Sequence, residues 1–143
     1  MTVARILKEK GRDVVITQPH RTLKEAAALL AERRVGAAVV SDAAAAVLGI
    51  ISERDIVRAI GAGSSSALEE PVSRHMTSRV STVTENTSID NVMEMMTTGR
   101  FRHVPVVEEG RLVGIISIGD VVKRHVDALD NERRALRDYI ATA

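Results

Sequence analysis

Gly49-Ile50-Ile51-Ser52-Glu53-Arg54-Asp55 recurs 65 residues later as Gly114-Ile115-Ile116-Ser117-Ile118-Gly119-Asp120. The chain therefore contains two copies of one small unit. A unit repeated at this period does not bury its apolar face alone, so we expect the two copies to pack against each other around a pseudo-twofold axis. Clefts between the copies then form a related pair.

The composition limits the classes of function. At 143 residues the chain has about the length of one domain. Apolar residues make up 45% of it, yet Phe101 and Tyr139 are its only aromatic residues, which argues against a nucleic-acid platform of stacked rings. The formal charge of +1 provides no long-range attraction to nucleic acid or to an anionic membrane. We therefore expect any anion binding to be local, with no nucleic-acid or membrane partner.

The residues that most often carry covalent or metal chemistry are missing or scattered. The chain contains no cysteine, which excludes disulfides and thiolate catalysis and agrees with a reducing compartment. His20, His75 and His125 have no carboxylates at ligand spacing, so no metal site is predicted. The charged N-terminus has the pattern of neither a signal peptide nor a membrane span. We expect a cytoplasmic protein.

The same order of elements is predicted in both copies, which gives an α+β fold of two β-α-β-β-α units. Thr22 and Glu25 form a capping-box pattern that starts the first helix of copy one. An N-terminal helix is predicted to end near Gly11. For copy one, apolar spacing then predicts a strand at 14–16, the helix that Thr22 starts, strands at 36–40 and 47–51, and a helix at 53–60. For copy two it predicts a strand at 80–83, a helix at 88–98, strands at 102–107 and 112–117, and a helix at 118–126.

Two further segments flank or connect the copies. Residues 61–67 are rich in Gly and Ser, which predicts a mobile surface connection. Past the repeats, Val126, Leu129, Leu136 and Ile140 fall on one helical stripe. This stripe either packs back on the chain's own body, which we favour, or forms a subunit contact. The predicted boundaries are 1–66 for the first repeat with the N-terminal helix, 72–127 for the second repeat, and 128–143 for a C-terminal helix.

The repeated Ser-x-x-Asp pattern carries the main functional signal. Ser52 with Asp55, and Ser117 with Asp120, stand where an apolar strand gives way to a helix. For one isolated copy, a helix cap explains the pattern. Its repetition favours a shared ligand geometry, in which the carboxylate accepts from two vicinal ribose hydroxyls while the serine and the positive end of the helix hold a phosphate.

The ordered set of motifs resembles a known family. Arg74-His75-Met76-Thr77-Ser78-Arg79-Val80, Arg102-His103-Val104-Pro105-Val106-Val107 and the duplicated Gly-Ile-Ile-Ser-x-x-Asp together resemble a tandem pair of cystathionine-β-synthase (CBS) domains, or Bateman module, over roughly residues 3–126. The resemblance implies two CBS units that bind adenosine-containing ligands (AMP, ADP, ATP or NAD(H)) in clefts between the copies, and it implies a homodimer.

The resemblance also assigns roles at the two Ser-x-x-Asp motifs. It implies that Asp55 and Asp120 hold ribose hydroxyls, while Ser52 and Ser117 support the ribose or phosphate. In the Asp120 cleft, the adenine is expected against segments of both copies: Val15, Val35, Gly36, Ala37 and Ile115.

Phosphate binding is expected to favour the Asp120 cleft. The family uses basic residues at the positions of Arg102 and His103 to grip phosphates, and we assign these two to that cleft. Arg54 is expected to reach across the axis and add a second guanidinium. Ser81 completes the candidate ligand-binding residues.

The leading hypothesis is a regulatory module that binds an adenine nucleotide and reports to an unidentified effector protein. The alternative is a structural or interaction module that dimerises through its CBS faces and C-terminal helix without sensing nucleotides. An enzyme is not expected, because the sequence contains no phosphate loop, metal cluster or catalytic triad pattern.

Overall fold

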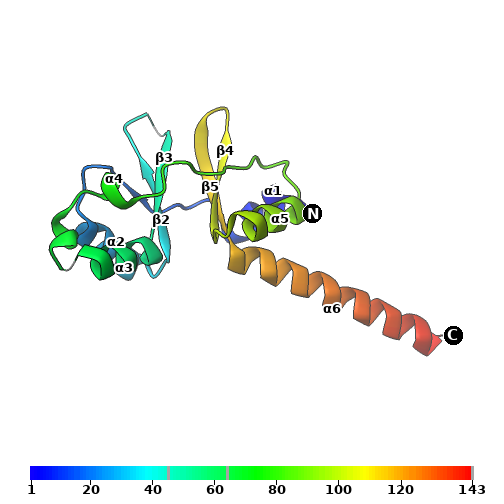
Figure 1. Ribbon diagram of the computed structural model, residues 1–143. Coiled ribbons are helices and arrows are strands. Elements are labelled where there is room, and N and C mark those ends of the chain that lie inside the picture. The colour runs from blue at the N-terminus through cyan, green and yellow to red at the C-terminus, as the bar shows by residue number, and fades with distance from the viewer. Residues whose placement is uncertain (45, 64, 143) are drawn as a thin grey trace.

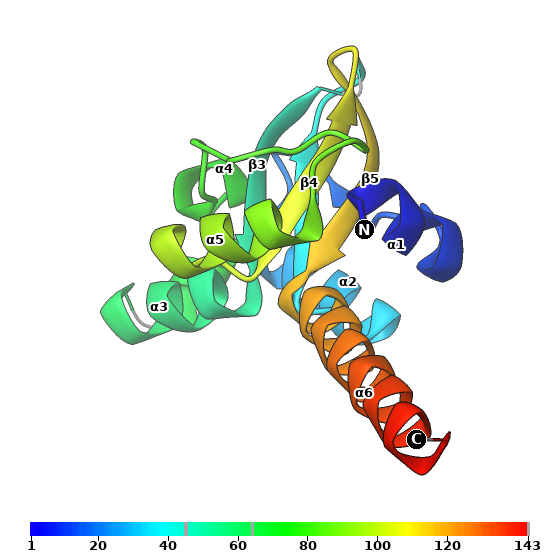
Figure 2. The ribbon, with the colours of Figure 1, turned by 90° about the vertical axis from the view of Figure 1, so that its right-hand side faces the viewer.

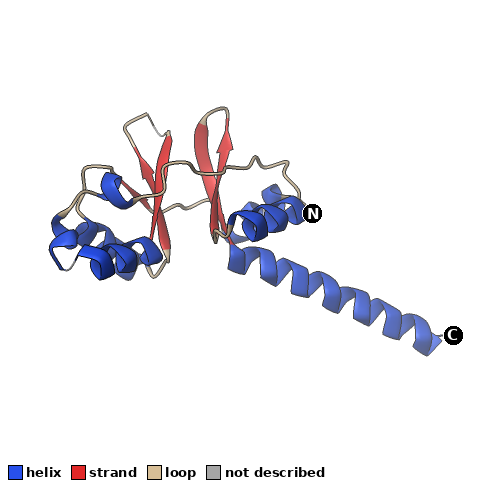
Figure 3. Ribbon diagram, viewed as in Figure 1, coloured by secondary structure: helices blue, strands red, loops and turns tan. Residues whose placement is uncertain are grey.

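The computed structural model describes residues 1–44, 46–63 and 65–142, and its strands form two sheets that lie side by side (Figure 3). In copy one, β2 (Ala37–Ser41) pairs in parallel with β1 (Ile16–Thr17) and antiparallel with β3 (Val47–Ser52). In copy two, β4 (His103–Glu108) and β5 (Arg111–Ser117) form an antiparallel pair. The helices lie on the outer flanks of this central pair of sheets.

The helices begin where the sequence predicts caps. In copy one, α2 (Leu23–Arg33) starts with the capping box, since Glu25 N donates to Thr22 Oγ1 at 3.1 Å and Thr22 N donates to Glu25 Oε1 at 3.3 Å. The second helix of this copy is α3 (Glu53–Gly63). In copy two, Ser88 caps α5 (Ile89–Gly99), and α6 (Ile118–Thr142) follows β5 directly.

Each copy has its own aliphatic core. The two strands of each hairpin supply β-branched side chains, and the first helix of each copy covers them. Met96 is buried in the core of copy two, and Met93 and Met95 pack against it. The fully buried large side chains are Ile6, Leu7, Leu23, Ile51, Ile116, Val3, Val39, Val40, Val72, Val92, Val104 and Val106.

The segments that precede each repeat pack on the opposite copy. Helix α1 (Val3–Lys10) lies beside β5 (Figure 2). Its Val3, Ile6 and Leu7 belong to the core of copy two. Conversely, the 3-10 helix η1 (Ser65–Glu69) and α4 (Val72–His75) add Ala67 and Val72 to the core of copy one. The N-terminal helix, which the sequence grouped with the first repeat, is therefore part of the second core.

Three predicted elements differ from the structure. No strand forms at 80–83; Val83 makes a single parallel bridge to Val106. The first strand begins at Ile16 rather than at residue 14. Among its described residues, the Gly- and Ser-rich connection is helical: α3 continues to Gly63, and Ala67 in η1 is only 1% exposed. Residue 64 of this predicted connection lies outside the described residues.

The C-terminal helix does not pack back on the body. Residues 118–142 form one continuous helix that projects away from both copies (Figure 1). The apolar stripe lies in solvent, with Val126 56%, Leu129 52%, Leu136 61% and Ile140 66% exposed, so the favoured interpretation is wrong for this chain. Residue 143 of the predicted helix lies outside the described residues. Among the described helices, none is long and apolar enough to cross a membrane.

Candidate functional site

The two Ser-x-x-Asp motifs form identical hydrogen-bonded caps at the strand–helix junctions. Ser52 N and Oγ donate to Asp55 Oδ2 at 2.9 and 3.0 Å, and Asp55 N donates to Ser52 Oγ at 3.3 Å. The bonds between Ser117 and Asp120 have the same three lengths. Each motif therefore caps its helix, as the helix-cap interpretation of the sequence pattern predicts. The cap uses only Oδ2 of Asp55, and no described residue donates to Oδ1, which remains able to accept a ligand hydroxyl.

A cavity of about 490 Å³ joins the Asp55 motif to copy two. The end of β3 and the first two turns of α3 form one wall, and two segments of copy two form the other. A ligand here contacts both copies at once. The lining residues are Gly36, Ile50, Ser52, Glu53, Arg54, Asp55, Val57, Arg58, Thr77, Arg79, Val80, Ser81, Arg100, Phe101, Arg102 and His103.

The cavity has an excess of positive charge. Five arginines line it, whereas Glu53 and Asp55 are the only acidic residues among its described lining residues. None of the five arginines makes an ion pair within the described part of the chain. Because guanidinium groups bind phosphate oxygens through paired hydrogen bonds, unpaired arginines around one cavity favour a phosphorylated ligand. The five are Arg54, Arg58, Arg79, Arg100 and Arg102.

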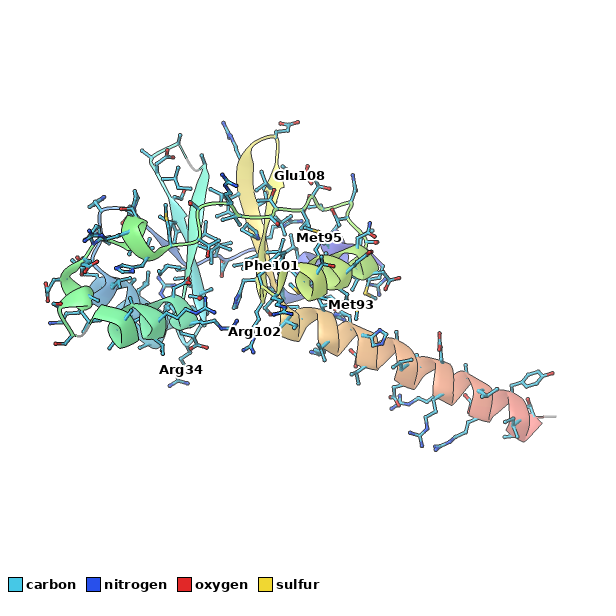
Figure 4. The ribbon with its side chains drawn as sticks, viewed as in Figure 1. Arg34, Met93, Met95, Phe101, Arg102 and Glu108 are labelled. Carbon is cyan, nitrogen blue, oxygen red and sulfur yellow. The ribbon has the colours of Figure 1, made fainter. Side chains whose placement is uncertain are left out.

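The basic residues of copy two reach this cavity from the end of α5 and the start of β4. Arg100 caps the C-terminal end of α5 and has left-handed backbone angles (φ 56°, ψ 36°). The carbonyl of Arg102 accepts from Ile118 N at 2.8 Å, so its backbone is anchored in copy two. Its side chain lines the cavity between the two sheets, whereas Arg34 points away from the body (Figure 4).

This placement reverses the predicted grouping of phosphate-binding residues. The sequence assigned Arg102 and His103 to Asp120, which belongs to their own copy, but the structure places both in the cavity that contains Asp55. Arg54, which was expected to reach towards Asp120, lines the same cavity. The physical reason is that the two sheets face each other, so Arg102 and the first residue of β4, His103, lie beside copy one.

The Asp120 motif is occupied by a lysine from α1. Lys10 Nζ donates to Asp120 Oδ2 at 2.6 Å and to the Ile115 carbonyl at 2.8 Å. Both charged side chains are less than one-third exposed. Burial tends to raise the pKa of Asp120, but the hydrogen bond and charge of Lys10, together with Ser117, hold that pKa below its usual value.

The remaining predicted residues divide between the cavity and its surroundings. Gly36 and Ser81 line the Asp55 cavity. Ala37 is buried in β2, Val15 packs against the core of copy one, and Val35 is 38% exposed. The structure thus gathers Ser52, Arg54, Asp55, Gly36, Ser81, Arg102 and His103 at one cavity and leaves Val15, Val35, Ala37, Ile115, Ser117 and Asp120 outside it.

The repeat, its fold and its paired motifs agree with comparisons with known proteins. The family model for the CBS domain matches residues 3–62 and again residues 72–127. The chain belongs to the CBS domain family. The mitochondrial CBS domain-containing protein CBSX3 of Arabidopsis thaliana is 33% identical to it, over 97% of this chain and 71% of the relative.

Solved structures of CBS proteins share the fold. The CBS-domain containing protein ATU1752 of Agrobacterium tumefaciens is 50% identical, with a TM-score of 0.85 over 87% of this chain and 99% of that one. The CBS domain protein PAE2072 of Pyrobaculum aerophilum, solved in complex with AMP, is 32% identical, with a TM-score of 0.75 over 84% of this chain and 89% of that one.

Within this CBS pair, His103 lies where charges of both copies meet. Its side chain is half-buried, and its Cε1 lies 3.7 Å from the point that a Cβ on Gly36 would occupy. Burial, aided by the charges of Lys10 and Arg102, lowers the pKa of His103, while Glu53 and Asp120 oppose this shift. The imidazole is therefore held in its neutral form until the pH falls below its ordinary pKa.

Sequence reasoning missed three charged residues of the site region. Arg58 lies one helical turn after Arg54, and this spacing of four was the available signal. Arg79 directly precedes the segment 80–83 that was predicted as a strand, and no local pattern marked its side chain as part of a site. For Lys10, no local pattern pointed to Asp120, because its helix was assigned to the other copy.

Proposed function

We propose that this CBS pair is a regulatory module that binds an adenine nucleotide in the Asp55 cavity. The observation that supports this proposal most directly concerns the lining of one cavity. It combines Asp55 Oδ1, which can accept hydrogen bonds from ribose hydroxyls, with five arginines that lack ion-pair partners in the described chain. The ribose hydroxyls bind the carboxylate, and the phosphates bind the guanidinium groups. The AMP complex of the Pyrobaculum aerophilum relative supports a ligand of this class.

The charge of the cavity favours a ligand with several phosphates. A single phosphate satisfies one or two guanidinium groups in bidentate geometry and leaves the others unpaired. ATP, ADP or the pyrophosphate of NAD(H) engages more of them. We therefore infer an affinity order in which ATP and ADP exceed AMP, with adenosine weakest.

The role that we propose is regulatory rather than catalytic. The cavity is lined by both copies, so a ligand that fills it fixes their relative orientation. A ligand shifts such an equilibrium only by its different affinity for the two arrangements. Contacts to Asp55 from one copy and Arg102 from the other provide that difference, and an effector protein reads the resulting arrangement.

Thermal unfolding with AMP, ATP, NAD⁺ and NADH tests this function. A ligand at a hundred times its dissociation constant adds about 2.7 kcal/mol to the free energy of unfolding, a shift on the order of 10 °C for a chain of this size. We expect Asp55→Asn to abolish the shift and Asp120→Asn, in the same hydrogen-bond geometry, to retain it. A shift that survives Asp55→Asn places the ligand elsewhere, and no shift with any nucleotide contradicts the sensor function.

The exposed stripe on α6 supports a second candidate, an interaction module that dimerises. Leu129 and Leu136 present apolar side chains on a helix that touches little else of the chain (Figure 1). Helices with apolar residues at this spacing pair with a second helix of the same kind. Analytical ultracentrifugation should show a wild-type dimer and a monomer for Leu129→Gln/Leu136→Gln, while Ala135→Gln, on another face, stays dimeric. A wild-type monomer at micromolar concentration contradicts this candidate.

A further inference from the structure

The outer part of α6 carries an apolar face that the described chain leaves uncovered. Val121 and Arg124 hold the start of this helix on the body, since Val121 is buried in the core of copy two and Arg124 forms an ion pair with Glu9 of α1. Residues 125–142 are all exposed (Figure 1). Because helices in proteins gain most of their stability by packing an apolar face, this part of α6 lacks the contacts that stabilise a helix.

The exposed face has the heptad spacing of a coiled coil. Its members recur at alternating intervals of four and three residues, which places them on one side of the helix, away from Val121 and Arg124. They occupy the positions called a and d in a heptad, and all but one are apolar. The six residues are Val122, Val126, Leu129, Arg133, Leu136 and Ile140.

The residue types at these positions are those of a two-stranded parallel coiled coil. Val126 and Ile140, at a positions, are β-branched, and both Leu129 and Leu136 stand at d positions. This distribution favours two helices over three or four when the helices run parallel. Arg133 is the remaining a residue, and a single charged residue at such a position fixes the register at a cost in stability.

The charges that flank the face match those of a second, parallel α6. Glu132 stands at the g position, directly before Arg133, and Arg137 stands at the e position, directly after Leu136. In a parallel pair, Glu132 of each chain faces Arg137 of the other, which gives two equivalent ion pairs. Within the described part of the chain, Glu132 and Arg137 make no ion pair, so both are available for this contact.

An antiparallel pair would instead bring like charges together. When the six a and d positions overlap fully in this orientation, Glu132 faces Glu132 of the second chain and Asp130 faces Asp130. Arg137 then lies beside Lys123 of the second chain. Like charges placed against each other weaken an interface, so the charge pattern selects the parallel orientation.

We propose that α6 pairs in parallel and in register with α6 of a second copy of this chain. This inference rests on the second candidate function, dimerisation through α6, and specifies its geometry. The apolar face of one chain covers the same face of the other, and Glu132 and Arg137 close its two edges. The two CBS pairs therefore stand at the same end of the helix pair.

Cysteine cross-linking tests the orientation, because the natural chain contains no cysteine. In a parallel pair each a residue lies opposite itself, so chains with Val126→Cys alone or Ile140→Cys alone should form disulfide-linked dimers under mild oxidation. In the antiparallel pair, residue 126 lies opposite Leu136 and about 15 Å from its own equivalent, so only a mixture of Val126→Cys and Leu136→Cys chains links. Ala135→Cys, on the opposite side of the helix, is the matched control and should stay unlinked.

A charge exchange tests the flanking ion pairs. Glu132→Arg replaces two attractive pairs by two repulsive ones and should raise the dissociation constant of the dimer about tenfold at low salt. The double variant Glu132→Arg/Arg137→Glu restores opposite charges and should bring the constant back to about the wild-type value. Arg133→Val removes the charge from the apolar face and should tighten the dimer by about tenfold or more. Sedimentation equilibrium of the full chain measures all three constants.

The outcomes separate this geometry from the function on which it rests. Self-linkage of both single-cysteine variants, with rescue by the charge exchange, supports the parallel pair. Linkage only in the mixture of Val126→Cys and Leu136→Cys chains, or a charge exchange that fails to rescue, overturns the parallel pair and leaves dimerisation through α6 standing. A wild-type monomer, or a dimer that survives Leu129→Gln/Leu136→Gln, overturns both.

Discussion

Lys10 Nζ lies 2.6 Å from Asp120 Oδ2, whereas Asp55, held in the same cap geometry, has no lysine or arginine within ion-pair distance in the described chain. Two motifs with identical hydrogen-bond lengths thus differ in their electrostatics. Lys10 of the same chain neutralises the Asp120 carboxylate, while the arginines around Asp55 make no ion pair with any described residue. This difference makes the Asp55 cavity the nucleotide site that we propose.

Arginine at the end of α5 is predicted to contribute to phosphate binding. Arg100 and Arg34 end equivalent helices with the same φ of 56°, but only Arg100 lines the Asp55 cavity. A hydrogen bond to a charged group is worth about 1.5–3 kcal/mol, so Arg100→Ala should weaken ATP binding by about 10- to 100-fold. Arg34→Ala, with the same backbone conformation, should bind ATP as the wild type does. Equal losses in both variants, measured by calorimetry, contradict this role.

Acidification is predicted to strengthen nucleotide binding through His103. The pKa of His103 is lowered in the folded protein without ligand. The neutral imidazole therefore stabilises the fold above about pH 6.5, and this stabilisation is lost as the pH falls through the pKa of the folded state. A bound phosphate favours the protonated ring, so binding should take up a proton and tighten between pH 8 and pH 6.

The control for this pH dependence is His103→Gln. Because the phosphates of the ligand titrate near pH 6 with either protein, the ratio of the two affinities isolates the histidine. We expect this ratio to grow in favour of the wild type as the pH falls. A ratio that is constant from pH 8 to pH 6 means that His103 does not face the phosphates.

The Lys10–Asp120 ion pair is predicted to stabilise the fold in a pH-dependent way. Its partial exposure limits its value, so Lys10→Met should lower the free energy of unfolding by about 1 kcal/mol at pH 7, and Lys8→Met should leave it unchanged. Since the pKa of Asp120 is lowered in the folded state, this contribution is present above about pH 4 and is lost as the pH falls further. Urea unfolding of both variants at pH 7 and pH 3 measures it; a difference from wild type that persists unchanged at pH 3 argues against an ionic origin.

The docking of α1 on β5 is predicted to depend on Gly114. A Cβ at this position would lie 2.7 Å from Leu7 Cδ2, inside the buried core of copy two. Gly114→Ala should therefore destabilise the chain by about 1–3 kcal/mol through overpacking. At Gly119, the nearest atom to an added Cβ is 3.7 Å away, and alanine there should leave the helix as stable or more stable. Equal unfolding midpoints for the two variants contradict this packing.

The fold could be predicted from the repeat and from apolar spacing, but the pairing of segments could not. Thr22 with Glu25 and the Gly-Ile-Ile-Ser runs carry local signals, and the structure confirms the elements that they predict. Which copy receives Val3 or Val72 depends on contacts between residues distant in sequence, and apolar spacing along one segment does not encode its partner.

The sequence indicated which residues belong to the candidate site better than it predicted which of them lie together. Asp55, Arg102 and His103 were all chosen from the sequence, and the structure brings the three to one cavity. The sequence paired the basic residues with Asp120 because they precede it in the same copy, whereas facing sheets direct them to the other one. The exposed stripe around Leu129 shows the same limit, since periodicity reveals an apolar face but not what covers it.

A crystal structure of the wild-type chain grown with ATP tests the central claim most directly. We predict one nucleotide per chain in the cavity between the two copies, with its ribose hydroxyls on Asp55 Oδ1, its phosphates on arginines that include Arg102, and Lys10 still bound to Asp120. A nucleotide whose ribose lies on Asp120, with Lys10 displaced and the Asp55 cavity empty, would contradict it.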